Sequence, residues 1–116
     1  MRVRLAALLV VTAVSLGCST VRTDVDAGLA PWRTRVADEI PVGTDIKTVM
    51  VWFERQGMHP ERNPLARVDE HDLEVYLGSI PAREWYCGRW MLRAVIRVSS
   101  EGRVTAYDFH AMGDCL

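Results

Sequence analysis

The longest strand pattern in the chain, Trp90–Val98 (WMLRAVIRV), decides the fold together with the turn Ser100–Gly102 (SEG) and the run Val104–His110 (VTAYDFH) that follow it. Apolar side chains occupy every second position of the first run, and two arginines stand between them. This alternation predicts a strand with one buried face. The glycine of the turn suits the positive φ that a tight hairpin requires. The stretch therefore predicts an antiparallel hairpin.

A third strand and two short helices are predicted before the hairpin. Alternating apolar residues predict a strand over 73–80, ended by Pro81. A first helix is predicted over 31–39, with proline in its first turn and an apolar row of Trp32, Val36 and Ile40. A second helix is predicted between Thr44 as N-cap and Gly57 at the C′ position, with an apolar stripe of Ile46, Val49, Met50 and Phe53. The predicted fold class is α+β: two short helices packed on a three- to four-stranded antiparallel sheet, in two layers.

Composition limits the class of protein. The chain has 116 residues, of which 49% are hydrophobic and 25% charged, with a formal net charge of −1. This is enough for one globular domain, and the apolar fraction is too high for a disordered chain. A near-neutral chain also lacks the basic face that nucleic acid requires, so we expect no nucleic-acid partner.

The first twenty residues have the features of an export signal. Arg2 and Arg4 precede the apolar run Leu5–Leu16, which has the length of a signal-peptide core and is too short to span a bilayer. Val14–Cys18 (VSLGC) resembles the lipobox of bacterial lipoproteins, although that box prefers leucine where Ser15 stands. The alternatives are an ordinary secretory signal cleaved elsewhere and an uncleaved anchor.

The resemblance to a lipobox implies a lipid-anchored protein. Residues 1–17 would be removed as the lipoprotein signal peptide, and Cys18 would carry the acyl chains, palmitate among them. Ser19 after it, in place of aspartate, implies the outer membrane, with the domain facing the periplasm. Residues 18–30 are polar, small and aperiodic, which predicts a flexible tether, and residues 31–116 are predicted to form a single domain.

Two cysteines, Cys87 and Cys115, remain in the mature chain, where the implied compartment is oxidising. We expect a disulfide between them, with a metal or redox role and free thiols as alternatives. The hairpin supports this pairing: if Ser99 faces Arg103 across a three-residue loop, continued pairing places Cys87 opposite Cys115. Both sulfurs are thus expected at one end of the hairpin.

No catalytic constellation is evident. The sequence contains no nucleophile elbow, no Gly-rich phosphate loop and no H-E-x-x-H motif. The three histidines stand apart, and Glu70, His71, Asp72 and His110 lack a spacing that would direct them to one metal ion. We therefore predict no catalytic residue, no metal and no cofactor.

Aromatic and arginine side chains between strands form the candidate partner-binding residues. Trp85 and Tyr86, flanked by Arg83 and Arg89, are residue types enriched at protein interfaces. They would form a contact patch or, alternatively, cap the core beside the disulfide. Arg93 and Arg97 lie on the polar face of the longest strand, where the same register predicts cation–π contacts with Tyr107 and Phe109 on an exposed sheet.

The mature domain resembles the BamE (SmpA/OmlA-like) outer-membrane lipoproteins and the related β-lactamase-inhibitor-like folds. Ile40–Val49 (IPVGTDIKTV) is similar to the family's helix entry, and Glu101–Val104 (EGRV) to its last hairpin. The Leu-Gly-x-Pro that follows the helix in the family is missing, since Arg55–Met58 (RQGM) stands there. The family's task, supporting β-barrel insertion, is one implied possibility.

The predicted function is that of a non-catalytic envelope lipoprotein. It would act as an interaction or assembly module at the outer membrane, held in the membrane by its lipid and bound to another envelope protein. An alternative is a periplasmic inhibitor or immunity protein against a secreted hydrolase. A third hypothesis is a small hydrolase or metal-dependent enzyme.

Overall fold

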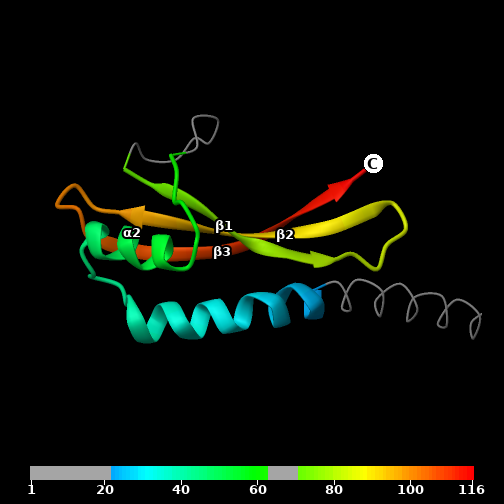
Figure 1. Cartoon of the computed structure of the whole chain (residues 1–116), viewed down its shortest axis with the longest axis horizontal. Helices are drawn as coiled ribbons and strands as arrows, with labels where there is room; N and C mark the ends of the chain where they lie inside the picture. Colours follow the sequence, from blue (N-terminus) through cyan, green and yellow to red (C-terminus); the bar gives the residue numbers. More distant parts are fainter. Residues whose placement is uncertain (1–21, 63–70) are drawn as a thin grey trace, which may run out of the picture.

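The structure, a computed structural model, describes residues 22–62 and 71–116. Residues 22–39 are helical, and we call this segment the N-terminal helix. It is followed by α2 (Ile46–Arg55), β1 (Leu73–Pro81), β2 (Cys87–Val98) and β3 (Val104–Cys115) (Figure 1). The strands form one antiparallel sheet in the order β1-β2-β3. The predicted α+β class is confirmed, with three strands in the described part of the chain.

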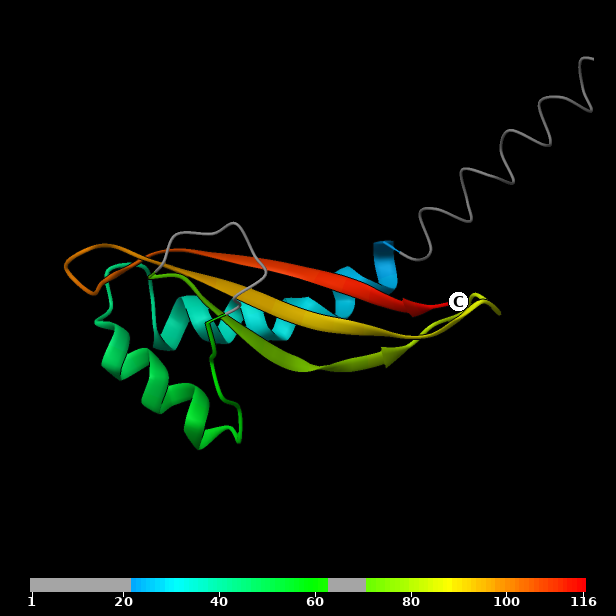
Figure 2. The same ribbon diagram turned by 90° about the horizontal axis from the view of Figure 1, so that it is seen from above.

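Both helices pack on the same face of this sheet. Figures 1 and 2 show the N-terminal helix running along the strands and α2 beside it, near the turn between β2 and β3. The buried core residues are Leu29, Val36, Ile40, Val49, Phe53, Val75, Leu77, Leu92, Ala94, Ile96, Val98 and Val104. Burial of each large apolar side chain in such a core contributes about 1.5–3 kcal/mol. The opposite face of the sheet, which we call the open face, carries no helix within the described ranges.

The N-terminal helix is longer than predicted, and residues 22–30 are not a flexible tether. Leu29 is 1% exposed, and Val25 packs against the same core. Gly28 permits the close approach, since a Cβ at that position would lie 3.1 Å from Cδ1 of Leu92. Pro31 therefore lies inside the helix and not in its first turn, which removes one helical hydrogen bond. Of the predicted tether, residues 18–21 lie outside the described residues.

Helix α2 starts one residue later than predicted. The N-cap is Asp45, whose side chain accepts a hydrogen bond of 2.9 Å from the backbone N–H of Lys47. Thr44 instead donates its hydroxyl to the carbonyl of Pro41 at 2.6 Å. An aspartate is as good an N-cap as threonine and adds a charge that the helix dipole favours. Gly57 follows the helix with a φ of 79°, which confirms the predicted C′ glycine.

The β2–β3 register departs from the prediction between two bulges. Cys87 pairs with Cys115 and Val98 with Val104, as predicted. Between these pairs the register is shifted by one residue, because one extra residue stands in β3 beside the turn and another in β2 next to Cys87. The two shifts cancel, so the extrapolated cysteine pairing is correct, although every pair between the bulges is displaced by one residue. Ala94, for example, pairs with Phe109.

The shifted register changes which side chains share the open face. A displacement by one residue exchanges the two faces of a strand. Tyr107 and Phe109 consequently point toward the helices: the Tyr107 hydroxyl donates to the carbonyl of Ile40 at 2.7 Å, and the Arg33 guanidinium lies 5.8 Å from the Phe109 ring centre. The predicted cation–π contacts of Arg93 and Arg97 with these two rings are therefore wrong.

Different elements meet at the two ends of the sheet. At one end, the start of α2 pairs with the hairpin turn: the N–H of Ile46 donates to the carbonyl of Gly102 at 2.8 Å. At the other end lie the β1–β2 turn (residues 82–86), the C-terminus and the first described turn of the N-terminal helix (Figure 1). The ion pair of Arg83 with Asp24, at 2.7 Å, joins the β1–β2 turn to the N-terminal helix.

Candidate binding surfaces

The β1–β2 turn exposes the most prominent apolar side chains of the described ranges. Trp85 is 89% exposed and Tyr86 48%, and their rings meet edge to face with centres 5.7 Å apart. Leu116, fully exposed, is held beside them because its N–H donates to the Tyr86 carbonyl at 2.9 Å. We call Trp85, Tyr86 and Leu116 the apolar tip. The alternative that the two aromatic residues cap the core is wrong for Trp85.

A disulfide and a glycine contact hold the base of the apolar tip. Cys87 and Cys115 are joined, which confirms the predicted disulfide across the end of the hairpin. Next to it, Trp90 packs over Gly113, where a Cβ would lie 2.9 Å from Cζ3 of the indole. A glycine is needed at that position because any larger residue would displace the ring. The apolar tip therefore adjoins strand ends that a disulfide and a close ring contact join together.

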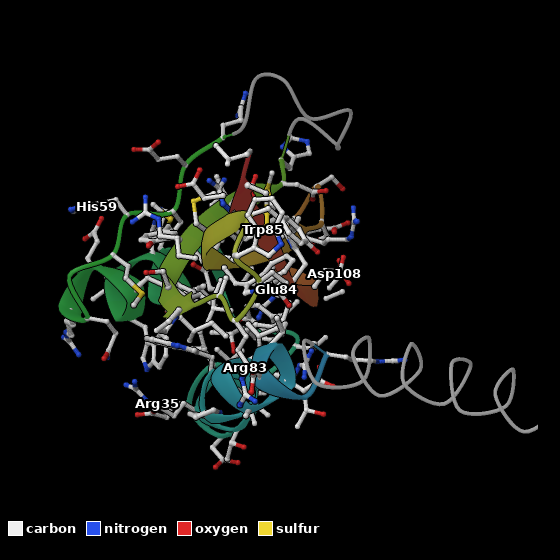
Figure 3. All side chains as sticks on the ribbon, turned by 90° about the vertical axis from the view of Figure 1, so that its right-hand side faces the viewer. Arg35, His59, Arg83, Glu84, Trp85 and Asp108 are labelled. Carbon is white, nitrogen blue, oxygen red and sulfur yellow. A yellow bond between two sulfur atoms is a disulfide. The ribbon has the colours of Figure 1, made fainter. Side chains whose placement is uncertain are left out.

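The arginines around the apolar tip are paired with acidic side chains. Arg83 contacts Asp24, with Nε 2.7 Å from the carboxylate. Arg89, one of the predicted partner-binding residues, lies 3.7 Å from Asp114. Figure 3, which looks onto this end of the molecule, shows Arg83 near the N-terminal helix and Trp85 over the ends of the strands. The positive charges near the tip are thus largely compensated.

The open face carries a first charge cluster around Glu74. Arg93 Nη1 donates to the Glu74 carboxylate at 3.2 Å, and His110 Nε2 lies 3.7 Å from the same oxygen. Glu74 and Arg93 have side chains 13% and 30% exposed, so this pair is better shielded than an ordinary surface pair. The sequence did not predict this cluster, because only the bulged register brings His110 opposite Arg93.

A second charge cluster surrounds Arg97. Its guanidinium donates to Asp108 at 2.6 Å and to Asp72 at 3.2 Å. The hydrogen bond to Asp108 and the attraction of both carboxylates raise the pKa of Arg97 above its usual value. Asp72 is 3% exposed and also accepts a hydrogen bond of 3.1 Å from the backbone N–H of Val98. The predicted arginines of the open face are therefore positioned by carboxylates.

Apolar side chains lie among these charges. Tyr76 is 45% exposed and Met112 49%. Along the β1 edge, next to Tyr76 and Arg93, a hollow of about 690 Å³ is lined by the strand and by the segment 56–62. That segment pairs with β1 through two hydrogen bonds between Glu61 and Glu74, of 2.7 and 2.8 Å. The open face is thus partly apolar and partly charged, and it is bordered by a hollow.

The remaining sequence predictions concern lipid attachment, metal binding and membrane spans. Cys18 and Glu70 lie outside the described residues. Among residues 22–62 and 71–116, no group of three or more potential ligands (His, Cys, Asp or Glu) could hold a metal ion. In the same ranges, no helix has the length and apolar character needed to cross a bilayer.

The fold and these surfaces define an α+β domain with an exposed tip and a mixed sheet face. Comparison with known proteins adds no relative: no protein-family model, no curated protein and no solved structure matches the chain.

Proposed function

We propose that the chain is a non-catalytic envelope lipoprotein that binds another envelope protein through the open face of its sheet. The observation that carries this proposal is the mixture of side chains on a face that no described helix covers. Tyrosine, methionine and arginine are enriched at protein interfaces, and Tyr76, Met112, Arg93 and Arg97 all lie on this face.

The open face has a suitable size for such a contact. A strand of 12 residues, the length of β2 and β3, extends over about 40 Å, and three strands span about 14 Å. The resulting area, on the order of 600 Å², is close to the roughly 800 Å² that each partner buries in a standard interface. The residues that border the hollow would supply the remainder.

The two charge clusters support binding in preference to catalysis. In both, an arginine is held by carboxylates at 2.6 to 3.2 Å, which fixes positive groups in place at little further entropic cost on binding. His110 shares its carboxylate neighbour with Arg93, so one carboxylate holds two side chains in place. Such positioned charges would select a partner of complementary pattern.

Site-specific photo-crosslinking in intact cells tests the partner. A photoreactive residue at Tyr76 should give one discrete crosslinked protein, whereas the same residue at Val51, 44% exposed on α2, should not. Recovery of barrel-assembly subunits would support the role implied by the BamE resemblance. Recovery of a single secreted hydrolase would favour the inhibitor hypothesis, and equal crosslinking at both positions would contradict an interface on the open face.

Metabolic labelling tests the anchor. We expect the full-length chain to incorporate radioactive palmitate and to fractionate with the outer membrane, because two or three acyl chains hold a domain stably at a bilayer. Cys18→Ser should abolish both. An unlabelled wild-type protein would refute the lipoprotein proposal, while labelling that persists in the variant would place the lipid on another residue.

A further inference from the structure

We propose that the apolar tip rests in the interfacial region of the membrane that holds the anchor, so that the domain stands with this end against the lipid surface. The inference depends on the proposed lipidation of Cys18 and extends it from a tether to a defined orientation. It is argued from the position of the tip, the side chains it exposes and the charges around it.

The tip lies close to the point where the chain would leave the membrane. Arg22, the first described helical residue, is four positions after Cys18 in the chain, so the two lie at most about 14 Å apart even in an extended chain. Asp24 follows one half-turn later and is bound to Arg83 at 2.7 Å. Trp85 is two residues beyond Arg83. A lipid on Cys18 would therefore be joined to the domain at the same end of the molecule as the apolar tip.

The exposed side chains have the chemistry of a membrane interface. Tryptophan and tyrosine concentrate at the level of lipid headgroups, where one part of the ring is in contact with acyl chains and the polar atom with water. Trp85 is 89% exposed, and Leu116 is fully exposed next to Tyr86. An indole so exposed contributes little to the fold, and the turn that carries it ends at the Cys87–Cys115 disulfide.

The charges near the tip favour a contact made by insertion of the aromatic rings into the membrane and not by attraction to anionic lipid headgroups. Arg83 and Arg89 are compensated by Asp24 and Asp114, at 2.7 and 3.7 Å. Removal of residues 1–17 takes away Arg2 and Arg4 and leaves 12 positive against 15 negative side chains, a net charge of −3. Such a domain gains nothing from anionic lipid. The contact should therefore be insensitive to salt.

Because the lipid anchor already attaches the domain to the membrane, a weak contact of the apolar tip is enough to orient it. One or two interfacial aromatic residues would not hold a soluble domain on a membrane, but an attached lipid converts their insertion into an intramolecular step at high effective concentration. The strands would then rise from the membrane for about 40 Å, with the turn Ser99–Gly102 farthest from it. The open face would stand upright and be accessible to a partner from the side.

Fluorescence quenching by brominated lipids tests the orientation. The full-length, lipidated protein is incorporated into vesicles of phosphatidylethanolamine and phosphatidylglycerol whose acyl chains carry bromine. We expect the wild-type emission to be quenched and Trp85→Phe to lose most of that quenched component. Trp32 and Trp52 lie on the helices, and Trp90, at the base of the tip, is packed over Gly113. As a matched control, Val42→Trp in the Trp85→Phe background places an indole, at a site 61% exposed, at the opposite end. It should add no quenched component to the emission of Trp85→Phe.

The outcomes separate this inference from the proposed lipidation. If the protein binds vesicles but Trp85 is quenched by aqueous iodide and not by bromine, the orientation is refuted and the anchor stands. If Cys18→Ser binds vesicles as well as the wild type does, or neither binds, the lipid anchor itself is refuted. A photoreactive residue at position 85 that crosslinks a protein in cells, and no lipid, would show that the tip is a protein interface and overturn the proposal.

Discussion

The carboxylate of Asp72 completes the backbone hydrogen bonding at the end of β2. It accepts from the Val98 N–H at 3.1 Å and from Arg97 at 3.2 Å while only 3% exposed. Asp72→Ala would leave a buried N–H without its acceptor, which costs about 1–3 kcal/mol. We expect urea denaturation to show that loss in the free energy of unfolding. Asp108→Ala, which removes an exposed partner of the same arginine, should cost less than about 1 kcal/mol.

An equal and small effect of the two substitutions would show that Asp72 is only another surface ion-pair partner. Asp72→Asn provides a finer comparison, since its amide oxygen can still accept from Val98 while its charge is lost. It should therefore retain most of the stability that Asp72→Ala loses.

The Tyr107 hydroxyl links stability to alkaline pH. Burial raises its pKa to about 12 from 10.0, and its hydrogen bond to the Ile40 carbonyl also requires the proton. Because the folded pKa is the higher one, the stabilisation is complete below pH 10 and is lost as the pH rises through 12. Urea denaturation at several pH values should show the free energy of unfolding falling across this window. The free energy of unfolding of Tyr107→Phe should fall less steeply with pH. A variant whose free energy falls as steeply as that of the wild type would contradict the assignment to Tyr107.

The N-terminal helix shows what a sequence pattern can and cannot predict. Its second half was predicted, because Trp32, Val36 and Ile40 form a clear apolar row. Val25 and Leu29 continue that row toward the N-terminus at helical spacing. They were missed because proline is typical of a helix start and Gly28 of a flexible linker. Gly28 is instead accommodated by its close approach to Leu92 and Ile80, and Pro31 is exposed within the helix, so packing of the apolar row outweighs local propensity.

Substitutions in the N-terminal helix test this correction. Gly28→Leu would force atoms into a space where even a Cβ lies 3.1 Å from Leu92 and 3.4 Å from Ile80, and such overpacking costs about 1–3 kcal/mol. Ala27→Leu, at the preceding exposed position, is the matched control and should be nearly neutral. The free energies of unfolding should differ accordingly. If both variants are neutral, residues 22–30 are a tether, as the sequence suggested.

The sheet shows a second limit of sequence patterns. Alternation predicted correctly that Leu92, Ala94 and Ile96 are buried, because burial alternates along one strand regardless of its partner. Which residues face each other across β2 and β3 depends on bulges, and these leave almost no trace in a single sequence. The disulfide was therefore predictable from the two ends of the hairpin, whereas the cluster of Glu74, Arg93 and His110 was not.

The disulfide makes the stability of the domain depend on the redox state of its surroundings. The bridge closes a loop of 28 residues that contains most of β2 and β3, and it constrains the unfolded chain more than it adds contacts to the folded one. In the chain-entropy model such a loop contributes about 3–4 kcal/mol. That is a large part of the 5–15 kcal/mol typical of a small domain. A domain of this size should therefore be markedly less stable in a reducing cytoplasm.

Denaturation with and without a reductant measures this dependence. We expect dithiothreitol to lower the free energy of unfolding of the wild type by about 3–4 kcal/mol. The double variant with Cys87→Ser and Cys115→Ser should start at that lower value and not respond to the reductant. Cys18→Ser, which leaves the bridge intact, should respond as the wild type does. A double variant as stable as the oxidised protein would mean that the sheet and helices alone sustain the fold, and the envelope would then not be required for its stability.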